Sequence, residues 1–418
     1  MLDINYIREN PKEVEKGAKV KGVIIDVKEV LKLDEEYRNI LQQVEELRSK
    51  RNELSKLLAD KDKREKHLKD AEKLKKELKE KEEKLNEIKN SLDKLLLAIP
   101  NMPFGDVPVG KDDTENVVAR KEGKLPEFDF EPKDYMEIAA QHDLIDTERA
   151  AKISGTRFGY LKNQAVRLEF ALVNFAMDTL MEEGFTPIIP PVLVRPEFMD
   201  KLGYTTQGGE EDIYHLEKDD MYLVGTSEQS VVPYFANEVL NEADLPKRFV
   251  AFSTCFRREA GSYGKDTRGI LRVHQFDKVE MVSFVHPEKS REEHRFLLSL
   301  EEGFMKALEL PYQVVDICTG DTGFPMAQKF DIEAWVPSEG KYRETHSTSN
   351  ATDFQARRLN IRYKTKEGNN TEFVHILNGT AFAVGRILIA LLENHQQADG
   401  TVKIPKALRK YVDFSKIG

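Results

Sequence analysis

The chain has 418 residues, of which 40% are hydrophobic and 33% are charged, and its formal net charge is −10. This length allows one large domain and an accessory module. The acidic balance excludes a positive field over the whole chain, so any contact with nucleic acid needs a local basic patch.

The two cysteines, Cys255 and Cys318, cannot form a disulfide framework and have no partner at metal-ligand spacing. This pattern is typical of a reducing compartment and predicts no zinc site. Apolar runs stay below the roughly 18 residues that span a bilayer, and the first residues, MLDINYIREN, lack a signal-peptide pattern. We therefore expect a cytoplasmic protein without membrane contact.

Residues 28–99 contain no proline or glycine and carry apolar residues at heptad spacing. One seam runs through 30–58 and another through 71–99, with a charged break at 59–67. Each helix can bury its stripe only on the other, which predicts an antiparallel coiled-coil hairpin. Residues 28–98 include 20 basic and 18 acidic residues, leaving a net charge of −12 elsewhere. From this pattern, a spacer or dimerisation rod and a rod along a phosphate backbone both stay open.

A linker rich in proline and glycine at 100–126 precedes a region of mixed pattern. We predict helices at 163–183 and 381–396. Strands are expected at 185–189, 222–224, 249–252, 279–285, 313–317, 330–336 and 373–377. Strands that follow one another without intervening helices favour an α+β fold with a largely antiparallel sheet flanked by helices. The predicted domains are 1–110 and 111–418.

A loop dense in arginine, CFRREAGSYGKDTRGILRVHQFDK at 255–278, connects two of these strands. A charge run usually forms a solvated face, but strands that a core would bury flank this one. Glycines let the loop bend, and guanidinium groups pair with anionic oxygens in a bidentate geometry. The stretch therefore predicts a loop that holds an anion over the sheet.

The chain resembles the bacterial-type seryl-tRNA synthetases, which are class II aminoacyl-tRNA synthetases, over essentially its full length. The three class II motifs match 184–193, 256–259 and 385–386, and Thr-Ser-Glu at 226–228 lies between the first two. The stretches AGSYGKDTRG, RVHQFDKVEM, TDFQARRLNIRY and IPNMPFGDVPVGKD are close to the wording of the serine family. The resemblance implies a class II synthetase core behind the N-terminal hairpin.

This resemblance implies a serine–tRNA ligase. Such an enzyme activates serine with ATP, releases pyrophosphate, and transfers serine from seryl-adenylate to tRNA(Ser) and also to tRNA(Sec). The family further implies a homodimer formed through the first motif, a Mg²⁺ ion and no zinc. Adenylation gathers negative charge, so fixed cations should matter more than general bases.

Catalytic roles are implied for Arg257, Glu259 and Arg386. Arg257 would bridge the α-phosphate and the serine carboxylate, and Glu259 would hold the adenine amino group. The implied ATP-binding set is Arg257, Arg258, Glu259, Val273, Phe276, Glu344, Thr345, His346, Ser347 and Arg386. The implied serine-binding set is Thr226, Ser227, Glu228, Arg257, Glu280, Asn378 and Thr380. Glu344 and Ser347 would bind Mg²⁺.

In the family, the hairpin binds the long variable arm of serine tRNAs by shape and backbone contacts. The implied tRNA-binding residues are Arg51, Lys61, Lys63, Arg64 and Lys66. No DNA partner is implied.

The third motif departs from the family at one place. Residues 378–381 read Asn-Gly-Thr-Ala where the family usually has Asn-Gly-Ser-Gly. Ala381 is expected to fill space where glycine lets the backbone approach a ligand. Two alternatives stay open: an amino-acid:carrier-protein ligase, which lacks the arm, and an inactive paralogue, which would lack Arg257 and Arg386.

Overall fold

The computed structural model describes residues 1–58, 64–205, 209–260, 268–366, 368 and 370–418. The chain forms two compact units, residues 1–100 and 101–418. Within the described ranges, no helix is long and apolar enough to cross a membrane.

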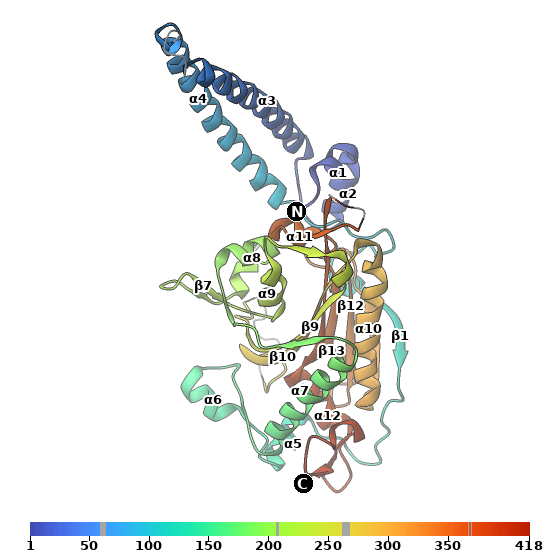
Figure 1. Cartoon of the computed structure of the whole chain (residues 1–418). Helices are drawn as coiled ribbons and strands as arrows, with labels where there is room; N and C mark the ends of the chain where they lie inside the picture. Colours follow the sequence, from blue (N-terminus) through green and yellow to red (C-terminus); the bar gives the residue numbers. More distant parts are fainter. Residues whose placement is uncertain (59–63, 206–208, 261–267, 367, 369) are drawn as a thin grey trace. The chain divides into compact units, whose positions relative to one another are not determined.

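The first unit is a long helical hairpin preceded by two short helices (Figure 1). Its helices are α1 (Ile4–Glu9), α2 (Pro11–Val20), α3 (Val27–Leu58) and α4 (Arg64–Leu97). The two heptad stripes meet in one seam, whose buried members are Ile40, Val44, Leu47, Leu78 and Ile88. The predicted hairpin is confirmed. The predicted break at 59–67 lies partly outside the described residues, and Arg64 already begins α4.

Polar contacts fix the base and the middle of the hairpin. Arg8 of α1 donates to both carboxylate oxygens of the buried Asp34, each at 2.7 Å. Farther along, Arg48 of α3 donates to Glu82 of α4 at 2.8 Å. The base therefore has its own anchor, independent of the distal half of the helices.

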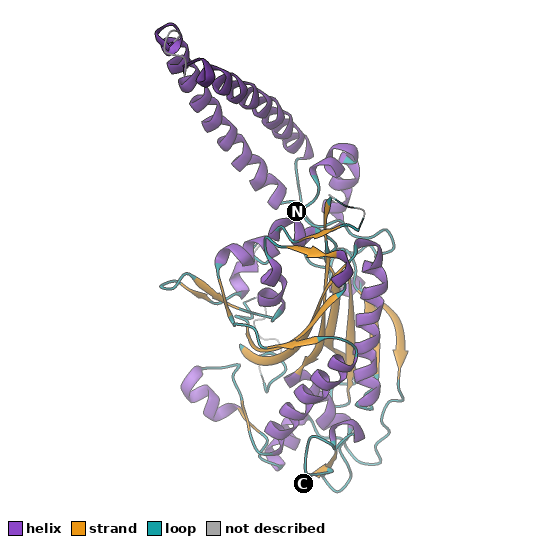
Figure 2. Ribbon diagram, in the orientation of Figure 1, coloured by secondary structure: helices purple, strands orange, loops and turns teal. Residues whose placement is uncertain are grey.

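The second unit is built on an eight-stranded sheet, in the order β1-β11-β12-β13-β16-β10-β9-β4 (Figure 2). Its strands are β1 (Val117–Glu122), β4 (Thr186–Ile188), β9 (Lys247–Phe256), β10 (Gln275–Val285), β11 (Tyr312–Asp316), β12 (Gln328–Val336), β13 (Lys341–Asn350) and β16 (His375–Ala383). Only the edge pair β4–β9 is parallel. The predicted α+β class and largely antiparallel sheet are confirmed.

Three helices cover one face of this sheet: α7 (Gln164–Glu182), α10 (Ser290–Ala307) and α12 (Val384–Asn394). Their apolar sides share a core with residues from the strands. On β10, Val279 and Met281 point into this core, whereas Phe276, Lys278 and Glu280 alternate onto the opposite face. That opposite face carries the cavity considered below.

Two predicted elements have different bounds in the structure. The strand expected at 373–377 is divided between β15 (Thr371–Phe373), in a separate three-stranded sheet, and β16. The helix expected at 381–396 begins only at Val384, because 381–383 continue β16. A short apolar run fits both a strand and a buried helix, so the pattern alone placed this boundary wrongly.

Glu301 of α10 is a fully buried acid behind the central sheet. A Cβ added at Gly379 would lie 2.9 Å from its Oε1, so the carboxyl group packs directly against β16. Neither carboxyl oxygen has a hydrogen-bond partner among the described residues. Burial, reinforced by Glu280 and Asp331, raises the pKa of Glu301 well above its ordinary value of 4.5.

Replacing Glu301 with glutamine is expected to stabilise the protein more at high pH than at low pH. The folded state keeps Glu301 protonated, so the free energy of unfolding falls as pH rises above 4.5 toward the raised pKa. Glutamine keeps the shape and removes this dependence. Urea unfolding at about pH 5 and about pH 8.5 measures the difference. An equal effect of Glu301→Gln at both pH values would contradict the prediction.

Candidate active site

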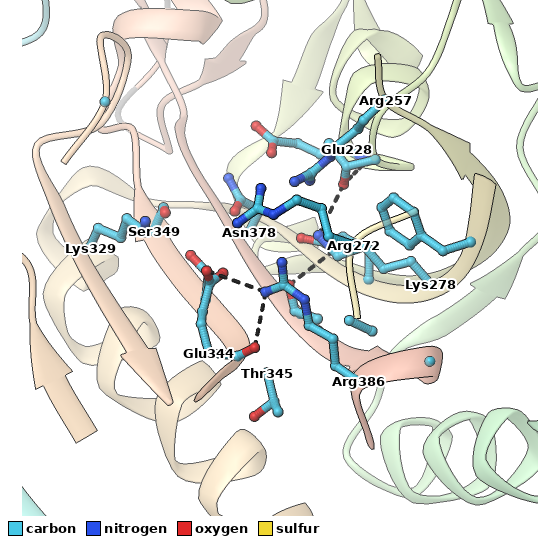
Figure 3. Close-up of a pocket in the computed structure, with 18 of the residues that line it drawn as sticks. Glu228, Arg257, Arg272, Lys278, Lys329, Glu344, Thr345, Ser349, Asn378 and Arg386 are labelled. Atoms are coloured by element: carbon cyan, nitrogen blue, oxygen red, sulfur yellow. Dashed lines mark hydrogen bonds and ion pairs between the residues drawn. The ribbon is translucent and has the colours of Figure 1, made fainter. Parts of the chain in front are cut away.

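A cavity of about 290 Å³ lies over β10, β13 and β16 (Figure 3). Half of the residues that line its wall were placed in the ATP and serine sites by the sequence analysis. They are Thr226, Glu228, Arg257, Glu259, Val273, Phe276, Glu280, Glu344, Thr345, Ser347, Asn378, Thr380 and Arg386. They come from segments far apart in sequence, which the antiparallel sheet brings together.

Two β-bulges set which side chains face the cavity. The β12–β13 register shifts where Ile332 pairs with His346 and Glu333 pairs with Glu344, which leaves Thr345 as the extra residue. This bulge puts Glu344 and Ser347 on the same face of β13, although a regular strand would put them on opposite faces.

The β10–β16 register shifts in the same way, so that Glu280 pairs with Thr380 while Val279 pairs with Phe382. The extra residue is Ala381. Its side chain is fully buried in the core and does not line the cavity, so the expectation that Ala381 fills ligand space is wrong. The Thr380 hydroxyl, by contrast, donates to Glu280 at 3.4 Å.

One end of the cavity is acidic. Glu228, the first residue of the short helix α9 (Glu228–Val231), and Glu280 of β10 are both buried there. Lys278 pairs with Glu280 at 2.6 Å and lies 3.4 Å from the Thr226 hydroxyl. Burial, with Glu280 adding to it, raises the pKa of Glu228 to about 7. Two carboxyl groups with one ammonium group leave this end able to accept a further cation and hydrogen-bond donors.

The other end carries two cations, Arg386 and Lys329, and Lys329 pairs with the buried Asp331 at 3.2 Å. Arg386, at the start of α12, donates to the Glu344 backbone oxygen at 3.0 Å and pairs with its carboxylate at 3.3 Å (Figure 3). The Glu344 side chain is 47% exposed. Desolvation opposes its ionisation, but Arg386, Lys329 and Arg257 outweigh that effect and lower the pKa of Glu344 to about 2. Glu344 therefore stays ionised among cations that could bind phosphate groups.

The Arg257 side chain is held between these two ends. Its Nε donates to the Gly225 backbone oxygen at 3.2 Å, and its guanidinium lies 5.4 Å from the centre of the Phe276 ring. Beside it, Arg272 donates to Glu259 at 2.7 Å. Both arginines thus have fixed positions on the cavity wall before any ligand arrives.

Three residues that the sequence analysis placed in the site do not line the cavity. Arg258 stacks on Tyr214, 5.7 Å from the ring centre. Ser227 is fully buried. His346 points away from Glu344 and Ser347 because of the bulge at Thr345, and burial lowers its pKa to about 3.

Sequence reasoning missed several polar residues of the cavity wall. These are Tyr204, Lys278, Thr322, Lys329 and Ser349, whereas Arg272 lies in the arginine-dense stretch predicted to hold an anion. For Lys278 a signal was present: Phe276, Lys278 and Glu280 are two residues apart on one strand, so their side chains must share a face. Tyr204 and Lys329 lie outside the three class motifs and carry no comparable signal.

The residues predicted to bind tRNA belong to the first unit. Arg51 lies exposed on α3. Lys61 and Lys63 lie outside the described residues, as do the side chains of Arg64 and Lys66.

Comparisons with known proteins agree with this architecture. The family profile "tRNA synthetase class II core domain (G, H, P, S and T)" matches residues 208–395, and "Seryl-tRNA synthetase N-terminal domain" matches residues 1–103. The serine–tRNA ligase of Acidothermus cellulolyticus is 53% identical to this chain, and the aligned region covers 76% of this chain and 74% of that ligase. The serine–tRNA ligase of Pyrococcus furiosus is 44% identical, and the aligned region covers 100% of this chain and 97% of that ligase.

A solved structure is also similar over the whole chain. The crystal structure of seryl-tRNA synthetase from Pyrococcus horikoshii complexed with ATP has a TM-score of 0.92 to this chain at 42% identity. The similarity covers 100% of this chain and 99% of that one. The chain therefore belongs to the seryl-tRNA synthetase family, the class II serine–tRNA ligases.

Proposed function

We propose that this cavity binds ATP and serine, forms seryl-adenylate there, and passes serine to tRNA(Ser). The observation that carries the proposal is the division of one cavity into an acidic end, with Glu228 and Glu280, and a cationic end, with Arg386 and Lys329. The ammonium group of an amino acid suits the acidic end, and a triphosphate suits the cationic end. Arg257 lies between them, where the carboxylate and the α-phosphate must meet.

In this proposal Arg257 bridges the two reacting anions. A carboxylate oxygen of serine attacks the α-phosphorus, and the bond to the pyrophosphate oxygen breaks. A guanidinium already fixed by Gly225 and Phe276 stabilises the charge that develops, without reorganising during the reaction. Phe276 and Arg386 hold adenine between them, and Glu259 and Val273 recognise its edge. The other residues of the predicted ATP set, Arg258, Thr345 and His346, would act through the backbone or through neighbours.

A Mg²⁺ ion fits the residues on β13. The bulge brings the Glu344 carboxylate and the Ser347 hydroxyl to one face, and both are hard oxygen donors of the kind that Mg²⁺ prefers. Phosphate oxygens and water would supply the remaining ligands. When bound, the ion would neutralise phosphate charge. We propose no zinc, since neither end of the cavity offers a cysteine.

Serine recognition falls to the acidic end. Thr226 and Glu228 would take the α-ammonium group, with Ser227 holding their loop, and Glu280 would accept from the serine hydroxyl. Thr380 and Asn378 complete this wall on β16. Alanine would leave the Glu280 carboxylate without the hydrogen bond from the serine hydroxyl, and sites of this kind reject such an analogue by about 10⁴–10⁵.

For tRNA, we propose that residues 1–110 form the binding domain and 111–418 the catalytic domain. The hairpin would lie along the long variable arm, with phosphate contacts from Arg51, Lys61, Lys63, Arg64 and Lys66. A rod that reads shape rather than bases should accept tRNA(Sec) as well, and we propose that the enzyme also charges it. We place this activity in the cytoplasm. The N-terminal match argues against a carrier-protein ligase, which is expected to lack this domain.

ATP–pyrophosphate exchange with each of the twenty amino acids tests the activation step. Serine alone should support exchange. Charging of tRNA(Ser) and tRNA(Sec) transcripts then tests the transfer step. An enzyme that exchanges pyrophosphate but charges neither tRNA would contradict the proposed transfer, and an enzyme without exchange would be an inactive paralogue.

We further propose a homodimer formed through α7 and the edge strand β4. Ile189, just after β4, is 82% exposed, and Phe170 on α7 is 56% exposed. Exposed large apolar side chains on a sheet edge and on the neighbouring helix are typical of a covered interface. Ile189→Lys is expected to convert dimers to monomers in analytical ultracentrifugation. The matched control is Val109→Lys, at an exposed residue of the linker, and a monomeric parent enzyme would refute the proposal.

A further inference from the structure

We infer that Tyr204 is a positioning residue of the serine site, whose phenol fixes the Glu228 carboxylate for the α-ammonium group. This inference rests on the proposed function of Glu228 and adds a residue from outside the class motifs.

The end of a short helix places Tyr204 in the cavity wall. Helix α8 (Pro196–Leu202) ends at Gly203, which has φ +90 in the left-handed region, and the Tyr204 amide donates back to the Met199 backbone oxygen at 3.1 Å. Glycine adopts this conformation without strain, so the Leu-Gly-Tyr sequence both stops the helix and turns Tyr204 toward the cavity.

Two neutral donors then hold the Glu228 carboxylate. The Tyr204 hydroxyl donates to Oε2 at 2.7 Å. Gln355 of α11 (Phe354–Leu359) donates to Oε1 at 3.2 Å. Glu228 and Gln355 are buried and Tyr204 is partly buried, so these hydrogen bonds are largely shielded from water.

Neutral donors suit a carboxylate that must bind a cation. A lysine or arginine at position 204 would fix Glu228 equally well, but it would cancel the negative charge that attracts the ammonium group. A phenol orients the carboxylate and favours its ionised form while leaving that charge in place.

The surroundings of Glu228 make this support necessary. Burial and the nearby Glu280 raise its pKa to about 7, and Tyr204, Gln355 and Lys278 oppose the rise. Besides Glu228, Glu280 and Arg257 are the charged groups that act on the Tyr204 phenol. Removing the phenol takes away one of these opposing contacts, so the pKa of Glu228 should rise further and its ionised fraction near neutral pH should fall.

Tyr204→Phe tests the inference, because phenylalanine keeps the ring packed against its apolar neighbours. We expect KM for serine in ATP–pyrophosphate exchange to rise about tenfold near neutral pH, with KM for ATP unchanged. The rise in serine KM on acidification should also begin at a higher pH than in the parent. Gln355→Leu should shift serine KM and its pH profile in the same direction.

Tyr222→Phe is the matched control. Tyr222 lies in strand β7 (Met221–Leu223), contacts the same apolar cluster and does not line the cavity. Equal increases in KM for serine and ATP, or an unchanged pH profile, would overturn the positioning role. A parent enzyme without serine-dependent exchange would instead overturn the proposed function itself, so the two failures are distinguishable.

Discussion

Arg257→Ala is expected to lower serine-dependent ATP–pyrophosphate exchange by about 10²–10³ or more, because the variant loses one preorganised cation that we propose bridges two anions. The contacts to Gly225 and Phe276 fix this guanidinium at the junction of the acidic and cationic ends of the cavity. KM for ATP should rise and the maximal exchange rate should fall, since the proposed role places the guanidinium against both the substrate and the transition state. Single-turnover adenylate formation separates these two effects.

A lysine at position 257 refines the experiment. Arg257→Lys keeps the charge but loses the planar, two-pronged donor set, so it should recover only a small part of the rate. Arg149→Ala is the matched control, since Arg149 is exposed on α6 (Thr147–Ser154), which contributes no lining residue. A thermal unfolding transition shows whether the Arg257→Ala enzyme is folded. If the folded variant exchanges pyrophosphate at the parent rate, the assigned role is contradicted.

Periodicity in the sequence was sufficient to predict the hairpin and most strands of the sheet. The heptad stripes around Val44 and Leu78 can be buried only on each other, and the short run at 279–285, rich in valine, favours a buried strand over a helix. Helix α10 was not predicted, although its buried residues recur at helical spacing. Strand β13 was missed since its polar residues, Glu344 to Asn350, do not alternate with apolar ones.

The position of the site could be predicted from the sequence more easily than the individual residues that line it. Family motifs identify which segments converge, but bulges decide which side chains reach the cavity. The extra residue at Thr345 turns His346 away and brings Ser347 in, and the extra residue at Ala381 sends that methyl group into the core. A one-residue slip in a strand exchanges its faces, and a single sequence contains no signal for where such a slip occurs.

Replacing residues 49–81 by a short Gly-Ser turn is expected to leave seryl-adenylate formation within a few-fold of the parent. The Arg8–Asp34 pair and the proximal seam around Ile40 and Ile88 would remain, so the base of the hairpin should keep its structure. The second unit has its own core, and every lining residue of the cavity belongs to it. Serine transfer to tRNA(Ser), by contrast, should fall by about 10²-fold or more through lost phosphate contacts.

A charge variant tests the same role without shortening the arm. Neutralising Lys61, Lys63, Arg64 and Lys66 together removes up to four phosphate contacts, each worth about 0.7–0.9 in the slope of log affinity against log salt concentration. The matched control neutralises four exposed lysines of the second unit: Lys124, Lys152, Lys403 and Lys406. It changes the net charge equally, so a general field effect would weaken tRNA binding in both variants, whereas a local contact would weaken it only in the first.

Two outcomes of the shortened enzyme would contradict the proposed role of the arm. If it charges tRNA(Ser) at the parent rate, the hairpin is a spacer. If it loses adenylate formation, the catalytic unit depends on the hairpin for its fold.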